Sequence, residues 1–218
     1  MGPSLPAASL DPLLEHPAIW RGRSVARVAT HSTGWVRLDE ALPGGGWPAA
    51  GLIELLTPRP GLGELRLLLP LLARLSQAVP PRWVAWVSPP FEPYAPALSA
   101  EGLSPERQLV IRTVEPFWAL EQALGSGVCA AVLGWLTRSE RTDLRRPLRR
   151  LQAATQRSGT PAFVFRAGLA RAQPSPALLR IAVEARVGGV RLELIKSRGG
   201  ARTPFELTWA ERAAYGRP

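Results

Sequence analysis

Cysteine, histidine and lysine are almost missing from this sequence of 218 residues. The lone Cys129 lies in an apolar run, which excludes an intrachain disulfide and a cysteine-based zinc site and indicates a buried, inert thiol. The two histidines, His16 and His31, are too few for a histidine-rich metal site or a convincing Ser-His-Asp triad. No spacing of carboxylates singles out an acid–base pair. The sequence therefore predicts no catalytic set, no metal and no cofactor.

Long apolar runs are missing as well. Arg66, Pro70 and Arg74 interrupt the longest of them, so none reaches the roughly 20 residues of a membrane-spanning helix. The first ten residues lack the basic and apolar regions of a secretory signal, and we expect a cytoplasmic protein. Hydrophobic residues make up 46% and charged residues 20%, which with this length suits one folded α/β domain.

Charge of one sign dominates, with a net charge of +10. This excess favours an anionic partner such as nucleic acid or an acidic protein face, or else it only reflects the arginine-rich coding of a GC-rich genome. Basic residues are densest between positions 138 and 157, where leucines at helical spacing predict an amphipathic helix bent at Pro147. Its outer face carries four candidate contacts to DNA, which are equally a solvated face or a dock for an acidic protein: Arg145, Arg146, Arg149 and Arg150.

Apolar strands alternate with helices along most of the chain. We expect a helix over Glu64–Gln77, kinked at Pro70, and a second over Glu115–Ser126. Buried or alternating strands are expected at Leu52–Leu56, Trp83–Val87, Leu109–Arg112, Val128–Leu136, Ala162–Phe165, Leu179–Ala185, Val190–Ile195 and Phe205–Trp209. This order predicts an α/β fold with a mainly parallel sheet flanked by helices and an antiparallel C-terminal β extension.

The expected domain organisation has three parts. Residues 1–30 form an N-terminal arm with a short helix, residues 31–209 form the core domain, and residues 210–218 form a C-terminal tail. Leu13 and Trp20 are the arm's candidate contacts, because a large apolar residue outside the core either folds back on its own domain or docks on a neighbouring protein.

A strand, a glycine-containing loop and a predicted helix follow one another around Gly61 and Gly63, which is an arrangement that can hold phosphate. A working loop of this kind needs a lysine and then a serine or threonine, yet Glu64 and Leu65 follow the glycine here. The Glu64 carboxylate would repel a triphosphate, and the strand Ala130–Leu133 ends without an acid to orient Mg²⁺. We therefore predict a degenerate nucleotide site and no enzyme.

The residues at these positions resemble the RecA superfamily over about residues 31–209. Within it, five phrases look like the ImuA family: HPAIWRG, LPGGGWP, PGLGELRLLLP, PPFEPYAPAL and QPSPALLR. The resemblance implies a RecA-like core and places Tyr94 where RecA proteins stack adenine, and Lys196 and Arg198 where they carry basic residues toward a neighbouring subunit.

The ImuA resemblance implies a non-catalytic accessory protein of SOS-induced translesion DNA synthesis. Its implied partners are RecA and an ImuB-type Y-family polymerase homologue, with an error-prone DnaE-type polymerase reached indirectly. Single-stranded DNA is a further candidate because of the basic helix face at Arg145, Arg146, Arg149 and Arg150, and not because of the resemblance. The alternative is a SulA-like inhibitor of cell division that binds FtsZ, since SulA is related and fold alone does not separate the two. A DNA-binding module with a vestigial ATPase comes third.

Overall fold

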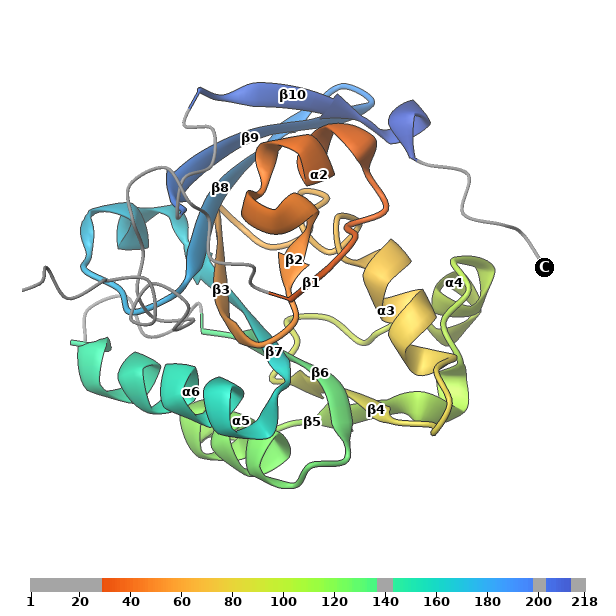
Figure 1. The fold of residues 1–218 in the computed structure, drawn as a ribbon, viewed down its shortest axis with the longest axis vertical. Coiled ribbons are helices and arrows are strands. Elements are labelled where there is room, and N and C mark those ends of the chain that lie inside the picture. The colour runs from red at the N-terminus through yellow and green to blue at the C-terminus, as the bar shows by residue number, and fades with distance from the viewer. Residues whose placement is uncertain (1–28, 137–142, 198–202, 213–218) are drawn as a thin grey trace, which may run out of the picture.

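The computed structural model describes residues 29–136, 143–197 and 203–212 (Figure 1). Residues 1–28 of the predicted arm, with Leu13 and Trp20, lie outside the described residues, as does Arg198. A sheet of eight strands in the order β10-β9-β8-β3-β7-β6-β4-β5 forms the centre. Its strands are β3 (Gly51–Thr57), β4 (Trp83–Val87), β5 (Gln108–Ile111), β6 (Cys129–Trp135), β7 (Pro161–Ala167), β8 (Leu179–Arg186), β9 (Gly189–Lys196) and β10 (Phe205–Thr208).

The sheet is mixed. Strands β3 to β8 pair in parallel, whereas β9 pairs antiparallel with both β8 and β10. A separate short ribbon pairs β1 (Thr30–His31) with β2 (Trp47–Pro48) just before β3 begins. Since parallel strands all end at one edge, the loops after β3, β4, β5 and β6 meet at the carboxyl edge of the sheet.

Helices cover the two faces unequally. Figure 1 shows α5 (Pro116–Gly125) and α6 (Arg145–Ser158) side by side against one face. The other face carries only short helices in the described ranges: α2 (Val36–Ala41), α3 (Leu69–Ser76) and α4 (Ala95–Ala100). Single 3₁₀ turns complete the described chain: η1 (Pro43–Gly45), η2 (Pro105–Arg107), η3 (Gly168–Ala172) and η4 (Trp209–Glu211).

The RecA-like fold expected from the sequence is wrong. A RecA-like core would place full helices on both faces of a mainly parallel sheet, but the sheet is mixed and one face has helices of no more than eight residues. The shortening has a local cause, because residues 64–68 form turns and Pro70 is the second residue of α3. Proline suits a helix start, where its missing N–H has no intrahelical acceptor. Pro70 therefore begins the helix rather than kinking it, and Pro147 lies in the first turn of α6 for the same reason.

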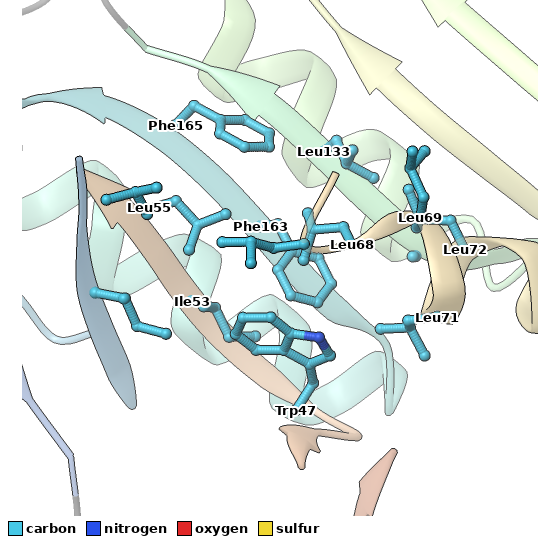
Figure 2. Close-up of a cluster of buried hydrophobic side chains, with 14 of the residues drawn as sticks. Trp47, Ile53, Leu55, Leu68, Leu69, Leu71, Leu72, Leu133, Phe163 and Phe165 are labelled. Carbon is cyan, nitrogen blue, oxygen red and sulfur yellow. The ribbon is translucent and has the colours of Figure 1, made fainter. Parts of the chain in front are cut away.

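Two buried clusters hold the helices to the sheet. The tryptophan-rich core, drawn in part in Figure 2, packs Trp47 against Phe163 and joins α2 and α3 to the sheet. The α5–α6 core lies on the other face and includes Leu120, Leu148 and Cys129. Neighbouring residues of β3 divide between the two clusters, Leu52 in the second and Ile53 in the first, as the alternation of a strand requires.

Candidate docking groove at the carboxyl edge of the sheet

A groove of about 630 Å³ opens at the carboxyl ends of β4 and β6. Trp86 and Trp135, which are almost fully buried, line it from the sheet side, with ring centroids 5.9 Å apart and planes 11° from parallel. Trp135 stacks in turn on Phe165 at 4.5 Å. The opposite walls come from the loop before α3 and from the loop that leads into α4. The volume lies in the range of sites that hold small molecules or anchor side chains of a partner.

The loop before α3 is closed by its own carboxylate. Glu64 is 3% exposed, and its two oxygens accept the backbone N–H groups of Gly61 and Leu62 at 2.7 Å each. These are the donors that a loop of this kind otherwise offers to an anion. The structure thus brings the five residues of the predicted degenerate nucleotide site around one groove: Gly61, Gly63, Glu64, Leu65 and Tyr94.

The rim of the groove is apolar and exposed. Phe91 is 68% exposed and Tyr94 is 69% exposed, both in the chain between β4 and α4. The chain after β5 leaves the same edge of the sheet without lining the groove, and it exposes Val114 and Trp118, at 97% and 60%. An ion pair between Arg112 and Glu92 joins these two segments. Exposed aromatic residues on neighbouring loops are typical of protein contact surfaces.

From the sequence we did not predict Phe91, Val114 and Trp118 as surface residues. The sequence did contain a sign of exposure for Phe91. Phe91 and Tyr94 lie in a proline-rich loop directly after a buried strand, and such loops run over the protein surface. Trp118 sits in the first turn of α5, whose buried residues begin at Ala119. We call Phe91, Tyr94, Val114 and Trp118 the aromatic rim.

The groove is bounded by the end of the described chain. Arg212 forms an ion pair with Glu101, one of the lining residues, and pairs through its backbone with Trp35. Trp209 packs against the loop so closely that a Cβ atom on Gly63 would lie 2.7 Å from its ring. The guanidinium of Arg66 lies over the same ring, 4.9 Å from the centroid. These contacts fix the loop before α3 against η4.

The predicted basic contacts lie apart from the groove. Arg145, Arg146, Arg149 and Arg150 are carried by α6, which packs on the other face of the sheet. Arg145 pairs with Asp143 at 2.9 Å, and Arg150 pairs with Glu121. Lys196 donates to the carbonyl of Ser175 at 2.8 Å. None of these five basic side chains lines the groove.

The described residues contain no group of three or more His, Cys, Asp or Glu side chains placed to hold a metal ion. Burial raises the pKa of the Cys129 thiol and, with the nearby Arg74 cation, lowers the pKa of His31. No helix in these stretches is long and apolar enough to span a membrane.

Comparison with known proteins points to inhibitors of cell division. The family model described as "Cell division inhibitor SulA" matches residues 53–160. The chain is 37% identical over 107 residues to the cell division inhibitor SulA of Photorhabdus laumondii, covering 46% of this chain and 55% of that protein. It is 38% identical over 86 residues to SulA of Edwardsiella piscicida, covering 37% and 50%. The chain spans about half the length of these curated relatives.

A solved structure of SulA from Pseudomonas aeruginosa is 27% identical, with a TM-score of 0.42, and the match covers 53% of this chain and 98% of that chain. The family model and the curated relatives overturn the ImuA assignment made from the five phrases. The predicted role in translesion synthesis is therefore wrong. The predicted partners are wrong as well: RecA, the ImuB-type homologue, the DnaE-type polymerase and single-stranded DNA. The relatives are named as inhibitors and not as enzymes, which agrees with the expectation of a non-enzymatic protein but does not bear on the phosphate loop.

Proposed function

We propose that this protein is a SulA-like inhibitor of cell division that acts in the cytoplasm by binding the tubulin-like division protein FtsZ. The observation that carries the proposal is the match of the SulA model to residues 53–160, because that stretch contains every residue that lines the groove. The SulA-like inhibitor, which was the alternative to an ImuA-like protein in the interpretation of the sequence, thereby becomes the main hypothesis.

The contact surface in this proposal is the aromatic rim. Tryptophan and tyrosine are enriched among residues that dominate binding free energy, especially beside a pocket that excludes water. Phe91 and Trp118 project more than half of their surface, and the groove beside Phe91 offers an apolar site for a partner side chain. Contact without catalysis is consistent with Glu64, whose carboxylate occupies the backbone donors of its loop.

The test is FtsZ assembly in the presence of the purified full chain. We expect the protein to lower the amount of sedimented FtsZ polymer in a dose-dependent way and to bind FtsZ directly. Phe91→Ala and Trp118→Ala should each weaken binding by about 30-fold, the size of an interface hot spot worth about 2 kcal/mol.

The matched control is Val128→Ala, which also trims an exposed apolar residue but lies just before β6, at the opposite edge of the sheet. This variant should bind like the parent. Undisturbed FtsZ assembly at a molar excess of the folded chain would reject the proposed function, whereas inhibition that survives both rim substitutions would reject only the rim as the surface.

A further inference from the structure

The outer side of α6 carries charge of a single sign. The helix contains five arginines and no carboxylate, and all five arginines are exposed. Its buried residues, among them Leu148 and Leu151, face the sheet. At 3.6 residues per turn, four of the arginines fall within an arc of about 100° on the side away from the sheet. We call these four residues the basic stripe: Arg146, Arg149, Arg150 and Arg157.

Most of this charge has no counterion in the ranges that the structure describes. Arg150 of the stripe pairs with Glu121 of α5. Arg145, which lies beside the stripe, pairs with Asp143. The other members of the stripe form no ion pair or side-chain hydrogen bond with a described residue: Arg146, Arg149 and Arg157. Positive charge therefore remains uncompensated along the whole helix.

This arrangement is unfavourable for the free protein. Arg146 lies in the first turn of α6, where the positive end of the helix dipole repels a cation. Arg149 and Arg150 follow it three and four residues later, which places like charges side by side on the helix surface. The exposed side chains gain no core packing in return. A local arrangement that destabilises the free protein is typical of a functional site, where a ligand of opposite charge relieves the repulsion.

The dimensions of the stripe suit one extended acidic peptide. From Arg146 to Arg157 the helix rises by about 16 Å, a length that about five extended residues cover. Ala153 is exposed between the two ends of the stripe, so a peptide backbone can approach the helix there without meeting a long side chain. Guanidinium groups bind carboxylates through two parallel N–H donors, which suits the side chains of glutamate and aspartate.

Two features favour carboxylates over a nucleic acid as the anion. α6 carries no aromatic side chain on which a base could stack, as the binding of single strands requires. α5 packs beside α6 and contributes Glu121 but no basic side chain, so toward α5 the positive surface is one helix wide, about 10 Å. A duplex has phosphates on both sides of a groove of about 12 Å and would need basic residues beyond this width.

We propose that the basic stripe of α6 binds an acidic peptide segment of a partner protein, with carboxylates spread over about five extended residues. The stripe lies across the sheet from α3 and α4, and none of its members lines the groove. The inference therefore goes beyond the proposed function, and it does not depend on FtsZ binding the aromatic rim.

Fluorescence anisotropy of a dye-labelled hexaglutamate peptide tests the proposal with the full chain at about 50 mM salt, where screening is weak. Hexaglutamine is the neutral peptide and should not bind. Arg146→Gln combined with Arg149→Gln keeps good helix formers and should weaken hexaglutamate binding by about ten-fold. The matched control combines Arg59→Gln with Arg191→Gln. It removes the same charge from two exposed arginines on other elements and should bind nearly like the parent.

The stability of the same variants separates a binding surface from a structural role. Since the stripe substitutions remove like charges from neighbouring positions, they should raise the midpoint of urea unfolding while they weaken peptide binding. The control variant should leave the midpoint nearly unchanged. A lower midpoint for the stripe variant would show that the arginines stabilise the helix, and it would contradict the proposal.

Three other results would overturn the proposal. Equal weakening in the stripe and control variants would assign the binding to net charge. Hexaglutamate binding no tighter than hexaglutamine binding would leave the stripe as a solvated helix face. An oligothymidylate of the same charge, or phosphatidylglycerol vesicles, bound more tightly than hexaglutamate and released by the stripe substitutions, would assign the surface to a nucleic acid or a membrane.

Discussion

At the scale of single residues, a buried carboxylate holds three strands together. Glu54 in the middle of β3 is fully buried and accepts hydrogen bonds from Arg166 on β7 at 3.2 Å and from Arg180 on β8 at 2.7 Å. The hydroxyl of Ser175 donates to the same carboxylate at 2.6 Å. The sheet order explains the meeting, since β3 lies between β7 and β8 and Glu54 pairs in register with Arg180. Two guanidinium groups therefore share one buried negative charge.

Neutralising Glu54 is expected to destabilise the protein severely. Glu54→Gln keeps the shape but leaves two buried cations without a carboxylate, and breaking a buried ion pair in this way costs about 3–5 kcal/mol. The midpoint of urea unfolding measures the loss. The control is Glu193→Gln, which removes the carboxylate of a half-exposed pair with Arg171 and should cost about 0–1 kcal/mol. Similar losses in the two variants would contradict a structural role for the buried triad.

At the scale of elements, the sequence predicted strands better than helices. Each of the eight predicted strands overlaps an observed one, because continuous or alternating apolar runs have few other ways to be buried. The predicted helix begins at Glu64, whereas the observed helix α3 begins at Leu69. Leucine spacing alone cannot distinguish the turns of residues 64–68 from a helix. The partners of Glu54 could not be predicted from the sequence for another reason. Arg166 and Arg180 lie 112 and 126 positions away along the chain, and only the strand order brings them next to Glu54.

The N-terminus of α6 yields a prediction about pH. A side-chain hydrogen bond from Arg145, helped by the backbone N–H of the same residue, lowers the pKa of Asp143 from 3.8 to about 2. Because the folded pKa lies below the unfolded one, the stabilising contribution is complete above about pH 4 and is lost as the pH falls toward 2. Arg145→Ala removes the guanidinium but keeps the backbone donor, so the pKa of Asp143 should rise part of the way back.

Carboxyl-carbon NMR titration of Asp143 measures this change directly. The control is Arg146→Ala, which removes an equal charge one residue further on. Arg146 acts on the Asp143 pKa only through the weakest of the causes, its charge, and the shift in this variant should be smaller. Equal shifts for the two substitutions would show that general charge, and not the Arg145 hydrogen bond, sets the pKa.

At the scale of the whole molecule, the sequence predicted the order of elements but did not decide between the two candidate families. Strand and helix order is shared by many α/β proteins, so it could not separate an ImuA-like from a SulA-like protein. The groove was only partly predictable: the loop residues Gly61 to Leu65 were identified by spacing, and Tyr94 by resemblance. The floor formed by Trp86 and Trp135 was not, because it depends on β4 and β6 lying side by side although they are separated in sequence by β5 and α5.

The two cores on opposite faces of one sheet predict a single unfolding unit. The strands contribute side chains to both cores, so neither core can lose its packing without exposing the back of the other. Each core carries its own probe once Trp83, which packs against the α5–α6 core, is replaced by phenylalanine. Trp35, Trp47, Trp86 and Trp135 lie in the tryptophan-rich core, and Cys129 lies in the α5–α6 core.

Tryptophan fluorescence and pulsed labelling of the Cys129 thiol should therefore report the same urea midpoint. Leu133→Ala in the tryptophan-rich core and Leu148→Ala in the α5–α6 core each remove a buried side chain and should each cost about 2–5 kcal/mol. Both substitutions should shift both probes together, whichever face they are on. If Leu148→Ala moved the labelling midpoint while fluorescence stayed unchanged, the two faces would unfold separately, and the groove could persist on a half-unfolded molecule.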